Sequence, residues 1–346
     1  MLALTQFKEK LIEKNIPAFR AKQVFEAVYK NGIDNYQMMS TLPKNLKEIF
    51  ATEFPILSVV PIKTLTSADL CTKKTLFRLK DNLNIEGVLM KFADGRNSVC
   101  LSSQAGCQLG CKFCATGTMK FGRNLTYEEI ADQVLYFAQH LHKEGEHISN
   151  IVFMGMGEPF MNYDNVIEAI KIINDKNGQN IGARHITLST SGIKEGIEKL
   201  ADEPFQVNLA ISLHAPNQEL RQKIMPIARK YSLEQLMKAV ENYLEKTHRR
   251  VSYEYVMLKN INDSQKEAHE LANLVKNQLC HVNLIPYNAT DIAHIAGSSR
   301  TNIRNFRDIL KQNGIPVTIR VTLGQDIAAA CGQLANKAEK TKQKTL

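Results

Sequence analysis

The sequence predicts an α/β fold built around a parallel sheet that closes wholly or partly into a barrel. Two observations lead to this prediction. From Ser98 onward, short apolar and β-branched segments alternate with amphipathic helical ones, and polar or sulfur-bearing residues follow several of the expected strands directly. Such alternation requires right-handed βαβ crossovers, and therefore a parallel sheet. In barrels of this kind the chemistry takes place at the carboxyl ends of the strands.

The chain before this sheet has a different character. Helical periodicity runs through residues 18–32 and, after Pro43, resumes at residues 44–50. The pattern then changes to alternating, β-rich runs separated by turn residues. We therefore expect four parts: a helical accessory domain at 1–55, a β-rich connector at 56–92, the core at 93–326, and a C-terminal segment with a basic tail at 327–346.

The core elements can be placed one by one. Two helices begin at capping boxes, Thr126 with Glu129 and Ser232 with Gln235, in which each side chain satisfies a backbone donor of the first turn. Short apolar runs of this kind are typical of buried parallel strands. The expected strands are residues 99–103, 150–155, 185–191, 206–214, 251–258, 281–286 and 317–321.

Composition limits the class of protein. The chain has 346 residues, contains no run of eighteen apolar residues, and becomes charged too early for a signal peptide. We therefore expect a soluble, cytoplasmic protein with no membrane partner. The net charge of +9 favours a polyanionic partner such as nucleic acid. The lysines of residues 337–344 could contact phosphate, or could belong to a frayed, solvated end.

Three of the seven cysteines form a compact motif. Cys107, Cys111 and Cys114 follow the expected strand 99–103 with C-x3-C-x2-C spacing. Three thiolates on one loop can hold three irons of a [4Fe–4S] cluster and leave the fourth iron open to a substrate. A structural zinc site would need a fourth ligand at matching spacing, and zinc-dependent RNA binding is kept as an alternative.

The motif and several longer strings resemble the RlmN and Cfr group of RNA adenine methyltransferases within the radical S-adenosylmethionine (SAM) superfamily. The resemblance implies a partial (β/α)6-type radical SAM barrel, a [4Fe–4S] cluster and SAM as cofactors, and 23S rRNA and tRNA as substrates. Pro159 favours the RlmN type, which modifies C2 of adenosine. The matching strings are RAKQVFEAVY, SSQAGCQLGCKFCATG, RNLTYEEIADQV, FMGMGEP, RHITLSTSG, ISLHAPN, VNLIPYN and DIAAACGQL.

The resemblance also implies roles for individual residues. Cys107, Cys111 and Cys114 match the cluster ligands. Glycines permit close backbone approach, and a carboxylate can accept hydrogen bonds from an ammonium group, as a SAM site requires. The residues that match the SAM contacts are Gly157, Glu158, Ser189, Ser212, Leu213, His214 and Asn288.

Three further residues carry the group's particular chemistry. By resemblance, Cys331 becomes S-methylated, Cys100 later attacks its sulfur and forms a transient disulfide, and Glu86 accepts the ring proton. One SAM molecule methylates Cys331, and a second yields the radical that activates this methyl group. Cys71 and Cys280 match nothing functional. The resemblance further implies a reductant such as flavodoxin or ferredoxin, and because RNA is the large partner we expect a monomer.

Two other functions stay open on the sequence. A Cfr-like enzyme would share every catalytic group and methylate C8 of the rRNA adenosine. A non-catalytic RNA-binding protein could keep a structural iron–sulfur cluster, although it would need neither Cys100 nor Cys331. Consumption of SAM by the reduced protein would separate the enzyme from the binding protein.

Overall fold

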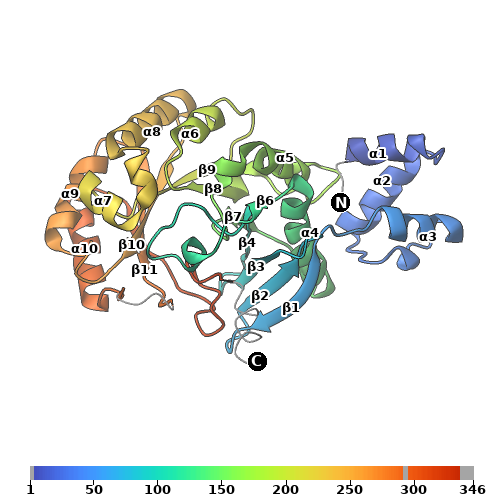
Figure 1. Ribbon diagram of the computed structural model, residues 1–346, viewed down its shortest axis with the longest axis horizontal. Helices are drawn as coiled ribbons and strands as arrows, with labels where there is room; N and C mark the ends of the chain where they lie inside the picture. Colours follow the sequence, from blue (N-terminus) through green and yellow to red (C-terminus); the bar gives the residue numbers. More distant parts are fainter. Residues whose placement is uncertain (1–3, 291–294, 336–346) are drawn as a thin grey trace.

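The computed structural model describes residues 4–290 and 295–335 (Figure 1). Its centre is a curved ten-stranded sheet in the order β1-β2-β3-β4-β7-β8-β9-β10-β11-β12 among the described residues. Neighbours are antiparallel from β1 to β4 and parallel from β4 to β12. The sheet does not close on itself, so the predicted α/β fold with a partial parallel barrel is confirmed.

All seven parallel strands predicted from the sequence are present. They lie in the order of the chain, as right-handed crossovers require. A separate two-stranded sheet pairs β5 (Gln104–Ala105) with β6 (Arg123–Asn124). The strands of the main sheet are β1 (Val60–Thr66), β2 (Thr72–Arg78), β3 (Asn84–Lys91), β4 (Asn97–Cys100), β7 (Asn150–Phe153), β8 (Ile186–Thr190), β9 (Asn208–Ser212), β10 (Val251–Met257), β11 (Cys280–Pro286) and β12 (Val317–Ile319).

Helices cover the outer face of the curved sheet (Figure 1). Both predicted capping boxes are confirmed: Glu129 accepts a bond from the Thr126 amide at 3.0 Å, and Gln235 accepts one from the Ser232 amide at 3.0 Å. These bonds fix where α4 and α8 begin. The core helices are α4 (Tyr127–Lys143), α5 (Tyr163–Asn174), α6 (Lys194–Leu200), α7 (Gln218–Ile224), α8 (Leu233–Thr247), α9 (Gln265–Val275) and α10 (Arg300–Gln312).

The N-terminal helices form a unit beside the barrel, on the right in Figure 1. They have their own hydrophobic cluster, which includes Phe7, Phe25 and Phe50 and is completed by Leu135 of α4. The helix predicted over residues 18–32 consists of α2 followed by a π-helical turn. The elements of this unit are α1 (Leu4–Glu13), α2 (Phe19–Phe25), the π-helical turn (Glu26–Lys30) and α3 (Lys44–Glu53).

Polar bonds attach this unit to the barrel. The amide and hydroxyl of Ser58 both donate to Asp132 of α4, at 2.7 and 2.8 Å. Gln139, also on α4, donates to the carbonyl of Ile33 at 3.0 Å. The basic tail at 337–344 lies outside the described residues. Over the described part of the chain, no helix is long and apolar enough to cross a membrane.

Candidate active site

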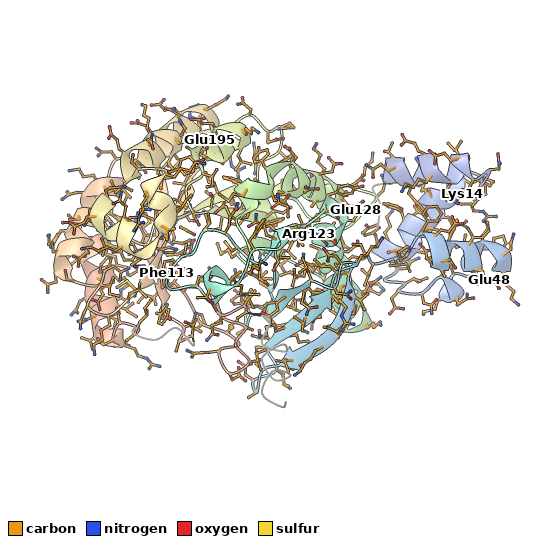
Figure 2. The ribbon with its side chains drawn as sticks, viewed as in Figure 1. Lys14, Glu48, Phe113, Arg123, Glu128 and Glu195 are labelled. Carbon is orange, nitrogen blue, oxygen red and sulfur yellow. The ribbon has the colours of Figure 1, made fainter. Side chains whose placement is uncertain are left out.

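A cavity of about 1020 Å³, its open mouth included, lies at the carboxyl ends of the parallel strands. Its walls come from the loops that follow these strands and from the C-terminal segment. The loop after β4 crosses the barrel opening, and Figure 2 shows Phe113 on this loop, close to α7. The sequence-predicted residues that line the cavity are Cys107, Cys111, Cys114, Gly157, Glu158, Ser189, Ser212, His214, Asn288 and Cys331.

The three cysteines of the C-x3-C-x2-C motif occupy one wall. Cys111 is buried, whereas Cys107 and Cys114 are half-buried. Burial raises the pKa of the Cys107 thiol to about 12 and that of Cys111 well above its usual value. A bound cation reverses this penalty, because it stabilises the thiolate that coordinates it.

The donor set fits an iron–sulfur cluster. Three sulfur ligands from one loop suit a cluster with an open iron, and the adjoining cavity leaves room for a small molecule at that iron. The donor set and the space beside it are therefore those that a [4Fe–4S] cluster with one open iron requires.

The turn after β7 is shaped by glycine. Gly157 has a φ of +101°, and a Cβ built there would lie 2.5 Å from the Cβ of Gln104. Glu158 is only 2% exposed and accepts bonds from the amides of Ser191 at 2.7 Å and Phe160 at 3.2 Å. Burial raises the pKa of this carboxyl group, and the backbone donors counteract the rise. The turn thus holds a fixed acceptor against the cavity.

The ends of β8 and β9 add two hydroxyl groups and an imidazole. The Ser189 and Ser212 hydroxyls lie 3.3 Å apart. Nδ1 of His214 accepts a bond from the Val256 amide at 3.1 Å, and burial lowers the pKa of His214 to about 3. The imidazole is therefore neutral, and its proton is on Nε2. Leu213 does not line the cavity: its side chain is fully buried, so only its backbone could contact a ligand.

The C-terminal segment carries Cys331 into the cavity. Asn288 donates to the carbonyl of Cys331 at 3.1 Å, and the Ala115 amide donates to the carbonyl of Gly332 at 2.7 Å. The hydroxyl of Thr116 donates to the carbonyl of Leu334 at 2.7 Å. The segment is therefore fastened to the cysteine loop on one side and to the end of β11 on the other. The Cys331 side chain is exposed to the cavity between them.

Cys100, at the end of β4, lines a second cavity of about 530 Å³, its open mouth included, and Cys331 is among the six residues that this cavity shares with the first. The pKa of Cys100 is raised to about 12, chiefly by burial and also by the Cys331 thiol, whereas Arg320 opposes the rise. Arg320 lines this second cavity and lies 3.7 Å from Glu254, which lines the first. Cys331 thus stands between the three-cysteine wall and Cys100.

Glu86 lines neither cavity. Its carboxylate is 3.1 Å from the ammonium of Lys74 and accepts a bond from the Ala335 amide at 2.9 Å. Lys74 also donates to the carbonyl of Ala328 at 3.0 Å. Glu86 is 3% exposed and Lys74 is 5% exposed, so the pair is buried. The two side chains thus form hydrogen bonds on both sides of Cys331, Lys74 at Ala328 and Glu86 at Ala335.

Comparisons with known proteins agree with this geometry. The profile of the Radical SAM superfamily matches residues 101–272, and that of the ribosomal RNA large subunit methyltransferase N-terminal domain matches residues 2–56. A Clostridium tetani protein named "Probable dual-specificity RNA methyltransferase RlmN" is 46% identical over 99% of this chain and 97% of its own length. The chain belongs to the RlmN family.

A second relative and a solved structure also support the assignment to the RlmN family. A Dictyoglomus thermophilum protein of the same name is 48% identical over 92% of this chain and 90% of its own length. The crystal structure of a radical SAM methyltransferase from Sphaerobacter thermophilus matches with a TM-score of 0.94 and 45% identity, over 96% of this chain and 97% of that one. As an RlmN-family member the protein is a radical SAM methyltransferase, and the family's cofactors are a [4Fe–4S] cluster and SAM. The Cfr-like and non-catalytic alternatives are not favoured.

Two charged residues at this RlmN-family site were missed by sequence reasoning. Glu254 lies within β10 and Arg320 follows β12, both inside otherwise apolar segments. Glu254 is 3% exposed, and burial raises the pKa of its carboxyl group. Charged side chains are rarely buried without a partner, so a lone charge within an apolar strand was the signal that could have identified them.

Proposed function

We propose that this protein methylates C2 of adenosine in 23S rRNA and in tRNA, and that the methyl group travels through Cys331. One observation carries the proposal: Cys331 is shared by the cavity of the three-cysteine loop and the cavity of Cys100. A methyl carrier must meet its methyl donor on one side and its resolving thiol on another. This position between two cavities supports both encounters.

Different residues of the cavity would bind the cluster and SAM. Cys107, Cys111 and Cys114 would hold the [4Fe–4S] cluster, which when bound supplies the electron that cleaves SAM. The buried Glu158 carboxylate, on a turn that Gly157 permits, would accept hydrogen bonds from the amino group of SAM. The Ser189 and Ser212 hydroxyls, the Leu213 backbone, His214 and Asn288 would contact the rest of that molecule.

The carrier step depends on the thiolate of Cys331. The enclosing cavity walls raise the pKa of this thiol, whereas the nearby Arg320 guanidinium lowers it and so favours the nucleophilic form. After methyl transfer to RNA, Cys100 would attack the sulfur of Cys331 and form a transient disulfide. The carrier is needed because the C2 carbon of adenine is electrophilic and cannot attack SAM itself.

Glu86 would accept the proton that leaves C2. In the structure its carboxylate is engaged by Lys74 and by the Ala335 amide, away from the cavity. In the structure, which contains no RNA, this carboxylate also positions the segment that carries Cys331.

The partners follow from the same proposal. Residues 1–55, a helical unit beside the barrel, would contact RNA, in keeping with the net charge of +9. Flavodoxin or ferredoxin would reduce the cluster. We propose that the protein acts as a monomer in the cytoplasm.

The test is anaerobic reconstitution with iron and sulfide, followed by reaction with SAM, dithionite and an unmodified 23S rRNA fragment or tRNA. Digested nucleosides are then identified by mass spectrometry. Formation of 2-methyladenosine is expected with both RNAs. If only 8-methyladenosine forms, the C2 assignment is wrong. If a protein with an intact cluster modifies neither RNA, the methyltransferase proposal fails.

A further inference from the structure

Arg221, on α7, is completely buried, with 0% of its surface exposed. Nε donates to the carbonyl of Leu213 at 3.3 Å, and Nη2 donates to the carbonyl of Ser191 at 2.6 Å. A longer contact of 3.4 Å joins Nη2 to the carbonyl of Ser212. The guanidinium therefore joins the loops after β8 and β9, both of which line the active-site cavity.

The remaining nitrogen of this side chain is unpartnered among the residues that the structure describes. Nη1 of Arg221 is buried and makes no hydrogen bond within the described part of the chain. A buried donor left in this state costs about 1–3 kcal/mol, and more when it is charged. Within residues 4–290 and 295–335, moreover, no carboxylate forms a salt bridge with this guanidinium. Among the described residues this buried cation has neither a counter-ion nor an acceptor for Nη1. An anionic acceptor beside Nη1 would therefore stabilise it.

The cysteine loop lies next to this guanidinium. Arg221 and Cys111 are close enough for their charges to interact. The end of α7 is attached to the same loop, because the Lys112 amide donates to the carbonyl of Ile224 at 2.9 Å. Met225, the next residue, lines the cavity. Arg221 therefore lies behind the three-cysteine wall, on an element bonded to it.

We propose that Arg221 is a positioning residue for the [4Fe–4S] cluster, donating from Nη1 to a cluster sulfur and offsetting the cluster's negative charge. The inference rests on the proposed function, since it requires the cluster to occupy the three-cysteine loop. A cluster held by three thiolates is anionic in both redox states and gains one more negative charge on reduction. A fixed cation beside it stabilises the reduced state and raises the reduction potential.

The test uses the reconstituted full-length protein and three variants. Arg221→Gln removes the charge but keeps a hydrogen-bond donor, whereas Arg221→Lys keeps the charge. Arg249→Gln is the control: Arg249 is half-buried and hydrogen-bonded, but it lies before β10, at the opposite end of the barrel. Iron and sulfide analysis gives the cluster content. A potentiometric titration followed by electron paramagnetic resonance gives the ratio of reduced to oxidised cluster.

At a fixed potential near the wild-type midpoint, we expect this ratio to fall about tenfold in Arg221→Gln, which corresponds to ~59 mV for a one-electron couple. Arg221→Lys and Arg249→Gln should stay within about twofold of the wild type. An unchanged ratio in a cluster-containing Arg221→Gln protein overturns the proposal. An equal fall in Arg221→Lys also overturns it, because the charge would then not be the cause.

A second measurement needs no variant. Electron–nuclear double resonance on the reduced wild-type cluster, in protein labelled with ¹⁵N-arginine, should detect a coupled arginine nitrogen. Absence of this coupling overturns the proposal even if Arg221→Gln does not fold. If the wild type binds no [4Fe–4S] cluster, the cluster site in the proposed function fails as well. A normal cluster without coupling refutes the role of Arg221 alone.

Discussion

The buried pair of Lys74 and Glu86 should show strong energetic coupling. The ammonium and carboxylate lie 3.1 Å apart, with 6% and 4% of the side chains exposed. Removing one partner of a buried pair costs about 3–5 kcal/mol, because the other charge stays buried without compensation. Lys74→Met and Glu86→Gln should each destabilise the protein by about this amount. The double variant should lose less than the sum of the two, by about 2 kcal/mol.

The assay is urea unfolding of the cluster-free protein, followed by circular dichroism, for the wild type, both single variants and the double variant. Lys223 and Glu219 provide the control pair: they are 2.6 Å apart but mostly solvent-exposed, and should show no measurable coupling. A coupling below about 0.5 kcal/mol between Lys74 and Glu86 would refute the reasoning, since the pair would then behave like a surface pair.

Three further predictions concern the cavity. Gly157→Ala places a Cβ 2.5 Å from a neighbouring side chain at a φ of +101°. Calorimetry should therefore show that the affinity for SAM falls at least about tenfold. The control Gly95→Ala, which has open space around the new Cβ, should bind SAM normally. Asn288→Ala removes a 3.1 Å hydrogen bond to the Cys331 carbonyl. The rate of Cys331 S-methylation, measured by peptide mass spectrometry, should fall about tenfold while the iron content stays unchanged. With a pKa of about 12, Cys100 is ionised at pH 8 in on the order of one molecule in ten thousand. Its alkylation should therefore be slow and should accelerate as the pH rises, and rapid labelling at pH 8 would contradict the raised pKa.

The sequence predicted the parts of the fold that depend on local patterns. The seven parallel strands and the starts of α4 and α8 were all identified, since apolar runs and capping residues are close together in the chain. Nine of the ten residues proposed for the cluster and SAM, all except Leu213, line one cavity because parallel strands end at the same edge of the sheet.

The parts that the sequence did not predict depend on contacts between distant segments. Glu254 meets Arg320 only because β10, β11 and β12 are neighbours in the sheet. The pairing of Glu86 with Lys74 and the Ala335 amide likewise brings together β2, β3 and the C-terminal segment. Such contacts leave no periodic signal in either segment. For this reason the sequence could suggest a chemical role for Glu86 but not its position.

Whether Cys331 carries the methyl group can be tested by a pulse–chase experiment. The reconstituted protein is first incubated with ¹³C-methyl SAM, then freed of it and allowed one turnover with unlabelled SAM and RNA. If Cys331 is the carrier, the first 2-methyladenosine formed contains ¹³C in its methyl group, and Cys331→Ala gives no product at all. An unlabelled methyl group on RNA, with the label left on Cys331, would show that Cys331 is not the carrier.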